Sequence, residues 1–238
     1  MTRHPFRDAV WWAADYAYAI AWQVRAFFSR TDPETFASGD RTPLVVLPGI
    51  YETWRFLQPL ITEMHERGHP VHVIAALGRN RWPVPRGARH VAAYMSERDL
   101  SGVVLVAHSK GGLIGKQVMA DRDVAARVAG MVAVASPFDG SVYGRLMLLP
   151  ALRAFSPSAP VIRALARERE PNARIVSVYG EFDPHIPGGS ELAGARNVRL
   201  QTGGHFRILA HPRVIAEVVR LADRPAVDGA PGRHRPPR

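Results

Sequence analysis

The 238-residue sequence contains no cysteine, so disulfide bonds and thiolate metal sites are excluded. Lysine is scarce too. Lys110 and Lys116 are the only two, and arginine supplies nearly all the positive side of a net charge of +10. Such a charge favours anionic partners. The arginines are scattered along the chain, however, and no zinc-finger or RNA-recognition signature accompanies them. We therefore expect a generally basic surface and no nucleic-acid partner.

Long uninterrupted apolar runs are also missing. The most apolar segment, residues 9–28, is interrupted by Asp15, Gln23 and Arg25, which makes a membrane span costly. No short apolar region leads into a small-residue cleavage site of the kind that ends a signal peptide. We expect a helix whose narrow polar stripe carries Asp8, Asp15 and Gln23. Two placements stay open, packing on the domain or peripheral contact with a membrane. The pattern fits a cytoplasmic protein, membrane-associated or not, and does not exclude export.

From residue 43 onward, short apolar runs alternate with helical patterns. The strand-like runs are "LVVL" (44–47), "VHVIAA" (71–76), "VVLVA" (103–107), "GMVAVA" (130–135), "RIVSVY" (174–179) and "NVRLQ" (197–201). The helical patterns are "TWRFLQPLITEMHER" (53–67), "GARHVAAYMSERD" (87–99), "KGGLIGKQVMADRDVAARV" (110–128) and "HPRVIAEVVRLAD" (211–223). Buried strands separated by helices predict an α/β fold, with a mainly parallel sheet of about six strands and helices on both faces.

The length of the chain suits one folded domain, and its composition is that of a soluble globular protein. We divide it into an N-terminal apolar helix and linker (1–42), an α/β domain (43–223) and a basic tail (224–238). The tail is rich in proline, glycine and arginine and has no hydrophobic periodicity, so we expect it to be disordered.

One serine stands where a predicted strand turns into a predicted helix, in "VVLVAHSKGGLIG" (103–115). Serine is a favoured helix N-cap, which would place Ser109 there without any chemistry. Yet the residues two before and two after it, Ala107 and Gly111, are small, as a sharp strand-to-helix turn requires. This pattern matches the nucleophile elbow G-x-S-x-G with alanine in the first position. On this motif alone both interpretations stay open.

Other loops supply the partners that a nucleophilic serine needs. A serine hydroxyl requires a general base, normally a histidine oriented by a carboxylate. Asp183 follows one predicted strand in "GEFDPHIP", and His205 follows the next in "TGGHFRIL". Asp139, in "SPFDGS" after the preceding strand, is a competing acid, although we favour Asp183. The backbone N–H groups of Ile50 and Lys110 are candidates for an oxyanion hole.

With these residues, the sequence resembles the α/β-hydrolase superfamily, in particular its compact lipase and esterase branch with an A-H-S-x-G elbow. The segment "ASPFDGS" (135–141) is similar to the T-P-H-x-G-S segment of triacylglycerol-lipase-like members. The resemblance covers residues 43–222. It departs at "PG" (48–49), where many relatives have "HG", and in the absence of a counterpart to the first two strands before residue 43. It implies the α/β-hydrolase fold with a minimal sheet and a triad of Ser109, Asp183 and His205.

The resemblance also implies a short cap between the sixth- and seventh-type strands, within residues 142–170. Its apolar side chains are candidates for an acyl pocket, although ordinary packing explains them as well; they are Leu146, Leu149 and Phe155, with Met147, Leu148 and Leu152 beside them. The expected activity is hydrolysis of a small-molecule or lipid carboxylic ester through an acyl-enzyme on Ser109. Alternatives are acyl transfer or thioester hydrolysis with the same triad, and a non-catalytic binding scaffold.

We expect neither a metal nor an organic cofactor. The sequence "HERGH" (65–69) matches the zinc-site pattern H-E-x-x-H, but Gly68 and Pro70 predict that the helix ends before His69. His108 is interpreted as a packing or hydrogen-bonding residue, and His185 as structural or exposed. The sequence does not indicate an oligomeric state.

Overall fold

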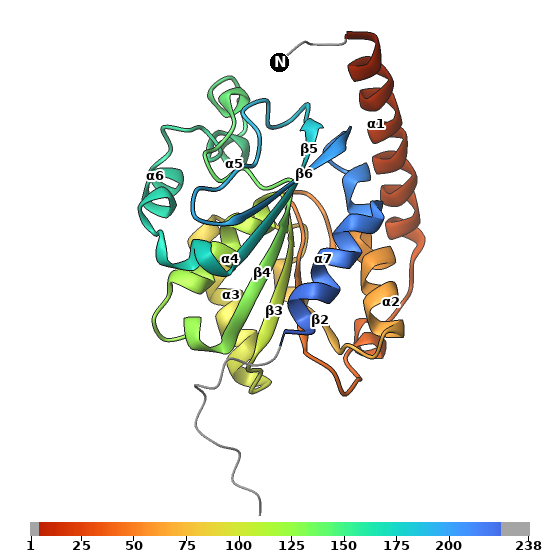
Figure 1. Ribbon diagram of the computed structural model, residues 1–238, viewed down its shortest axis with the longest axis vertical. Helices are drawn as coiled ribbons and strands as arrows, with labels where there is room; N and C mark the ends of the chain where they lie inside the picture. The colour runs from red at the N-terminus through yellow and green to blue at the C-terminus, as the bar shows by residue number, and fades with distance from the viewer. Residues whose placement is uncertain (1–4, 225–238) are drawn as a thin grey trace, which may run out of the picture.

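Six parallel strands form one sheet in the order β2-β1-β3-β4-β5-β6 (Figure 1). The computed structural model describes residues 5–224. The strands are β1 (Leu44–Leu47), β2 (Val71–Val73), β3 (Val103–His108), β4 (Val128–Val134), β5 (Ile175–Phe182) and β6 (Arg196–Gly203). The helices are α1 (Pro5–Phe28), α2 (Gln58–Glu66), α3 (Val84–Glu97), α4 (Lys110–Ala120), α5 (Pro150–Arg153), α6 (Pro160–Arg167) and α7 (Pro212–Ala222).

Strands β1 and β3 are buried along their whole length because both faces of the sheet are covered by helices. Every residue of β1 and β3 is buried. Successive side chains of a strand point to opposite faces. Val46 and Val104 therefore join a core that includes residues of α1, α2 and α7, whereas Leu47 and Leu105 join a second core with residues of α3, α4 and α6. Figure 1 shows the two helix layers on either side of the sheet.

The predicted fold class is confirmed, and each predicted strand is present. The first strand has the predicted bounds, while β2 is shorter because "AAL" forms a 3-10 helix, Ala75–Leu77, instead of continuing the strand. Both β5 and β6 extend beyond their predicted ends. Between β4 and β5 lie a 3-10 helix (Val142–Arg145) and the short helices α5 and α6, which form the expected cap segment.

Two further expectations concern helix ends. The helix α2 ends at Glu66, as predicted, so the two histidines of "HERGH" do not share a helix. The Nδ1 atom of His69 lies 2.9 Å from the carbonyl oxygen of Thr42. No helix of the described residues is long and apolar enough to cross a bilayer. Apart from Arg224, the tail expected over 224–238 lies outside the described residues.

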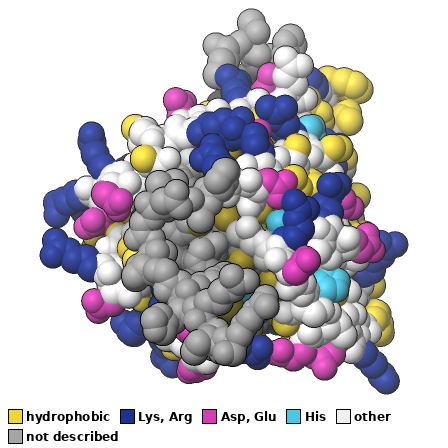
Figure 2. All heavy atoms as spheres, turned by 60° about the horizontal axis from the view of Figure 1, so that its bottom comes forward, with side chains coloured by type: hydrophobic (Ala, Val, Ile, Leu, Met, Phe, Trp, Pro, Cys, Tyr) yellow, Lys and Arg dark blue, Asp and Glu magenta, His cyan; other side chains and the backbone are white. Residues whose placement is uncertain are grey.

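The basic side chains do not gather into one continuous patch on the face shown in Figure 2. Lysine and arginine side chains are spread around this face, and acidic side chains are interspersed among them. This distribution matches the generally basic surface expected from the scattered arginines.

The close approach of α4 to β1 depends on a glycine. A Cβ atom at Gly111 would lie 2.1 Å from the carbonyl oxygen of Leu47, a backbone atom of a buried strand that cannot move aside as a flexible side chain would. We expect Gly111→Ala to lower the free energy of unfolding by about 3 kcal/mol, because either the helix or the strand must move. Urea unfolding measures this change. The matched control is Gly188→Ala, which places a Cβ in open space and should change stability by less than about 1 kcal/mol. Equal stability of the two variants would contradict the packing described.

Candidate active site

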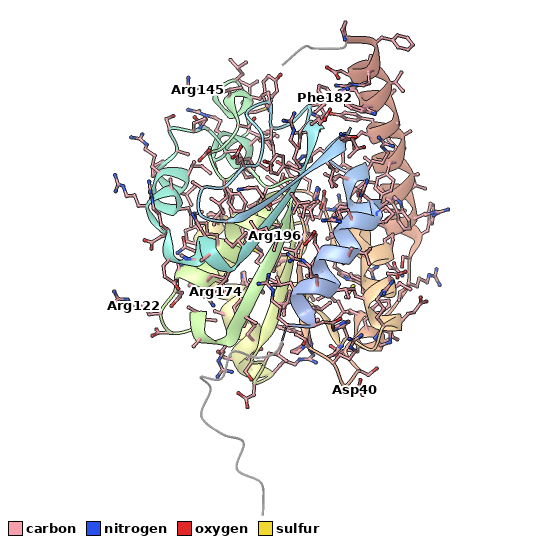
Figure 3. The ribbon with its side chains drawn as sticks, viewed as in Figure 1. Asp40, Arg122, Arg145, Arg174, Phe182 and Arg196 are labelled. Carbon is pink, nitrogen blue, oxygen red and sulfur yellow. The ribbon has the colours of Figure 1, made fainter. Side chains whose placement is uncertain are left out.

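Three polar residues lie together at the carboxyl edge of the sheet. Ser109 follows β3, Asp183 follows β5 and His205 lies two residues beyond β6. In Figure 3, Phe182 marks the carboxyl end of β5 at the top of the molecule, and Arg196 marks the start of β6 further down. Because the strands are parallel, their carboxyl ends meet at one edge, which is where ligands bind in open α/β sheets.

Ser109 occupies a strained turn between β3 and α4. Its backbone has φ 51° and ψ −118°, a conformation that costs a non-glycine residue about 1–3 kcal/mol. Its N–H donates to the carbonyl oxygen of Val134 at 2.9 Å, which ties the turn to β4. Ser109 occupies the N-cap position of α4, but its side chain makes no capping hydrogen bond, so capping does not account for a serine here. Gly112 permits the tight turn, because a Cβ there would lie 2.2 Å from Oγ of Ser136.

Ser109, His205 and Asp183 form a continuous hydrogen-bonded chain. Nε2 of His205 lies 3.0 Å from Oγ of Ser109, and Nδ1 lies 2.8 Å from Oδ2 of Asp183. The other oxygen of Asp183 accepts the backbone N–H groups of His185 (2.7 Å) and Ile186 (3.0 Å). The competing acid, Asp139, is exposed, and Asp183 already engages Nδ1 of His205. Of the two carboxylates considered, Asp183 is therefore the one that orients the histidine.

The charges of Asp183 and His205 shift each other's pKa values. Burial alone raises the pKa of Asp183, but the charge of His205 and the hydrogen bonds from His205 and His185 outweigh it, so the pKa lies below its usual value. For His205, burial lowers the pKa, yet the charge and hydrogen bond of Asp183 raise it above its usual value. Asp183 is thus ionised at neutral pH. With Nδ1–H directed at this carboxylate, Nε2 of the neutral ring can accept a proton from Ser109.

A second network joins the loop after β1 to the loop that carries His205. One oxygen of the buried Glu52 accepts the N–H of Gly49 at 2.7 Å and lies 2.9 Å from Nδ1 of His108. Nε2 of His108 lies 2.9 Å from the carbonyl oxygen of His205. The hydrogen-bonding role expected for His108 is confirmed. No sequence pattern indicated Glu52, although it lies within the same "LPGIYETW" segment as Ile50.

The helix α1 contributes a carboxylate that the sequence analysis did not assign to the site. Asp15 is fully buried and accepts three backbone N–H groups, those of His205 (2.8 Å), Phe206 (2.8 Å) and Arg207 (2.7 Å). A Cβ at Gly204 would lie 2.5 Å from Oδ1 of Asp15, so this glycine is what lets α1 approach the loop. The polar stripe of α1 therefore contacts the loop that carries His205.

His185 lies beside the hydrogen-bonded chain, and its ring centroid is 4.7 Å from that of His205. Burial, followed by the charge of His205, lowers the pKa of His185 to about 4, so its ring is neutral at neutral pH. Its Nε2 atom lies 3.1 Å from the hydroxyl of Tyr16 on α1. The structural role predicted for His185 thus has a specific partner, which was not foreseen.

A cavity of about 530 Å³ opens above Ser109 and His205. It is bounded by α1 through Trp12, Tyr16 and Gln23, by the loop after β1 through Ile50, and by the cap. The cap residues that line it are Tyr143, Gly144, Met147, Leu152 and Phe155. Leu146 and Leu149, which were expected to line an acyl pocket, do not, and they are 78% and 54% exposed. The cap consists of short helical turns, so part of its apolar run faces outward.

Both candidate oxyanion donors lie near Ser109, one in the wall of the cavity and the other as the next residue in the sequence. Ile50 lines the cavity, and Lys110 is the first residue of α4. The Lys110 side chain points elsewhere, because Nζ donates to the carbonyl oxygens of Asn80 (2.8 Å) and Trp82 (2.5 Å). Burial lowers the pKa of this ammonium to about 8. Across residues 5–224, no cluster of three or more histidine, aspartate or glutamate side chains is arranged to hold a metal ion.

Comparison with known proteins identifies solved structures that share this fold. No family model matches the chain, and no curated protein matches its sequence. Among solved structures, the mature lipase of Bacillus licheniformis covers 82% of this chain and 94% of its own, with 15% identity and a TM-score of 0.63. An α/β-hydrolase enzyme from the metagenome of Mar Chica lagoon sediments in Morocco covers 79% and 94%, with 18% identity and a TM-score of 0.57.

A third similar structure is an extracellular α/β-hydrolase from a Paenibacillus species, which covers 77% of this chain and 100% of its own at 17% identity and a TM-score of 0.54. The chain therefore has the α/β-hydrolase fold. At such low identities the likeness concerns the fold, and the chemistry has to be argued from the residues of this chain.

Removal of the Asp15 carboxylate tests its role in holding the His205 loop. Asp15→Ala leaves three buried N–H groups without an acceptor, and we expect it to lower the free energy of unfolding by about 2–4 kcal/mol. The matched control is Asp8→Ala on the same helix, whose carboxylate lies 3.7 Å from the side chain of the neighbouring Arg7. That change should cost less than about 1 kcal/mol in urea unfolding. If both variants are equally stable, the Asp15 bonds do not hold the loop.

Proposed function

We propose that the protein is a serine-dependent hydrolase of carboxylic esters, with Ser109 as nucleophile, His205 as general base and Asp183 as the orienting acid. The observation that carries the proposal is the hydrogen-bonded chain itself, with Oγ of Ser109 3.0 Å from Nε2 of His205 and Nδ1 2.8 Å from Asp183. Both distances lie within the range needed for proton transfer by a general base.

In the proposed reaction, Oγ of Ser109 attacks the ester carbonyl carbon while its proton passes to Nε2 of His205. Negative charge develops on the carbonyl oxygen, where the N–H groups of Ile50 and Lys110 are the proposed donors. Collapse of this intermediate breaks the ester bond, and the imidazolium protonates the departing alcohol. Water, activated by the same histidine, then hydrolyses the acyl-enzyme and releases the carboxylic acid.

The cavity favours an ester with an apolar acyl group. Its lining is mostly apolar and aromatic, with Met147, Leu152 and Phe155 from the cap facing Trp12 of α1. Such a lining stabilises an apolar chain by removing it from water. Thioester hydrolysis and acyl transfer would use the same three residues, and no feature of the cavity favours them over ester hydrolysis.

A non-catalytic binding scaffold is the alternative class, and the backbone of Ser109 argues against it. A scaffold has no need to hold a non-glycine residue at φ 51° with its hydroxyl directed at a histidine. Strain of this kind persists where the surrounding structure enforces it for function.

The first prediction from the proposed function concerns the nucleophile. Ser109→Ala should lower kcat for a p-nitrophenyl ester by about a thousandfold or more, because no other group replaces the attacking oxygen. Its stability should change little, because the hydroxyl makes no capping bond. Steady-state kinetics on the purified variant, with thermal unfolding as the folding control, measure both quantities. Turnover equal to that of the unaltered protein would refute the assignment.

The second prediction concerns the acid. Asp183→Asn should lower kcat by up to about ten-thousandfold, because the amide no longer fixes the required tautomer of His205. Asp139→Asn, which changes an exposed side chain, is the matched control and should retain nearly full activity. Kinetics on the two variants decide between the carboxylates, and an inactive Asp139→Asn with an active Asp183→Asn would reverse the assignment.

The third prediction concerns pH. His205 acts as a base only when neutral, and Asp183 raises its pKa above the ordinary 6.5. Activity should therefore fall as the pH drops through a value above 6.5 in the unaltered protein. In Asp183→Asn the residual activity should survive to lower pH, because the charge that raised the pKa is gone. The pH dependence of kcat/KM, measured for both proteins, gives the pH at which activity falls on the acidic side. If that pH is the same in the unaltered protein and in Asp183→Asn, Asp183 does not raise the pKa of His205.

A further inference from the structure

The helix α1 presents apolar side chains to solvent as well as to the protein core, where Ala19 is buried with Tyr18 and Trp22 packed beside it. Its polar stripe faces the protein, where Asp15 is buried and Gln23 lines the cavity. Its outer face is apolar along the whole 24-residue helix. We define this outer face by six large side chains, each at least half exposed, with exposed alanines between them; they are Phe6, Val10, Ile20, Val24, Phe27 and Phe28.

Such a face is unusual for a helix in contact with water. A solvent-facing helix normally presents charged and polar side chains outward. Here the outer face carries no charged residue, and the helix is about 36 Å long at the α-helical rise. Contiguous exposed apolar surface of this kind marks a site that contacts a partner or a membrane. In Figure 1, α1 runs along one edge of the molecule with no other element outside it.

The border of the outer face suits an anionic lipid surface. Arg7 and Arg25 flank the apolar side chains, and their guanidinium groups lie 4.3 Å and 5.0 Å from the ring centroids of Trp11 and Trp22. Both tryptophans pack against the protein, so the arginines are the border residues, and an arginine suits the boundary between lipid headgroups and acyl chains because its apolar stem carries a charged head. The net charge of +10 attracts anionic headgroups. The same charge opposes the alternative occupant, a second copy of this chain, because like charges repel.

We propose that the outer face of α1 binds the surface of an anionic bilayer, with the helix lying in the plane of the membrane. Docking uses the side of α1 opposite to Asp15, so the helix holds the His205 loop and the membrane at the same time. Trp12, half exposed, connects the outer face to the cavity, which it also lines. The docked protein therefore presents its cavity near the headgroup region, from which an acyl chain enters.

The cap supplies a second apolar surface at the same cavity. Leu146, Leu148 and Leu149 are each more than half exposed, next to the lining residue Met147. The cavity is thus bordered by exposed apolar side chains of α1 on one wall and of the cap on another.

Co-sedimentation with vesicles tests the proposal without relying on ester hydrolysis. The full-length protein should bind vesicles of phosphatidylglycerol and phosphatidylcholine, and bind phosphatidylcholine alone more weakly. The double variant Ile20→Gln/Val24→Gln should lose about tenfold or more in vesicle affinity, because two exposed apolar side chains that would enter the membrane become polar. Both residues are exposed, so the melting temperature of the variant should be unchanged, and thermal unfolding reports that it is folded.

A charge-matched pair separates a local contact from a general effect of net charge. Arg25→Gln, at the border of the outer face, should weaken binding to the anionic vesicles by about fivefold. Arg122→Gln removes the same charge on the opposite side of the molecule from α1 (Figure 3) and should leave binding unchanged.

Three results would overturn the proposal. The first is absence of binding by the unaltered protein, and the second is binding that Ile20→Gln/Val24→Gln leaves intact. The third is self-association in sedimentation velocity that the same double variant abolishes while vesicles are not bound, which would make the outer face a contact between copies of this chain.

Discussion

The candidate site depends on the hydrogen bonds that one carboxylate, that of Asp15, accepts from the backbone N–H groups of the His205 loop. A parallel sheet brings the ends of β3, β5 and β6 to one edge, but it does not fix the orientation of a side chain two residues beyond a strand. Asp15 does so from α1, by accepting the N–H groups of three successive residues. The His108 ring, bound to Glu52, holds the carbonyl group of His205 from the other side. The loop is thus fixed at both its N–H and its C=O groups.

This constraint explains sequence features that otherwise have no common cause. The glycine pair of "TGGHFRIL" is needed because a Cβ at Gly203 would lie 2.3 Å from the ring of Trp11, and one at Gly204 would collide with Asp15. The acidic residue in an otherwise apolar helix is needed as the acceptor. The outward apolar face of α1 then follows from geometry, since the polar stripe is already used against the protein.

Much of the fold was predictable because the strands are short, mainly apolar or alternating runs separated by helical patterns. Ser109, Asp183 and His205 were predictable for a related reason, since each lies in the loop just after a predicted strand and the residue types suit the same chemistry. Asp15 was not, because it lies 190 residues from His205 in the chain. Helical periodicity indicates that a polar stripe exists, but not whether it faces water or protein. The sequence also could not predict whether Leu146 and Leu149 face the cavity or solvent, because their orientation depends on how the short turns of the cap pack.

The central claim is that His205, held in place by the hydrogen bonds of its loop, activates Ser109 as a nucleophile. The most direct measurement is covalent labelling of the native protein with a fluorophosphonate, followed by peptide mass mapping. Attack by Oγ of Ser109 on phosphorus would displace fluoride, and the account predicts one label, on Ser109, that disappears in Ser109→Ala and is strongly slowed in His205→Ala. A folded native protein that takes up no label, or takes it up on another residue, would contradict the account.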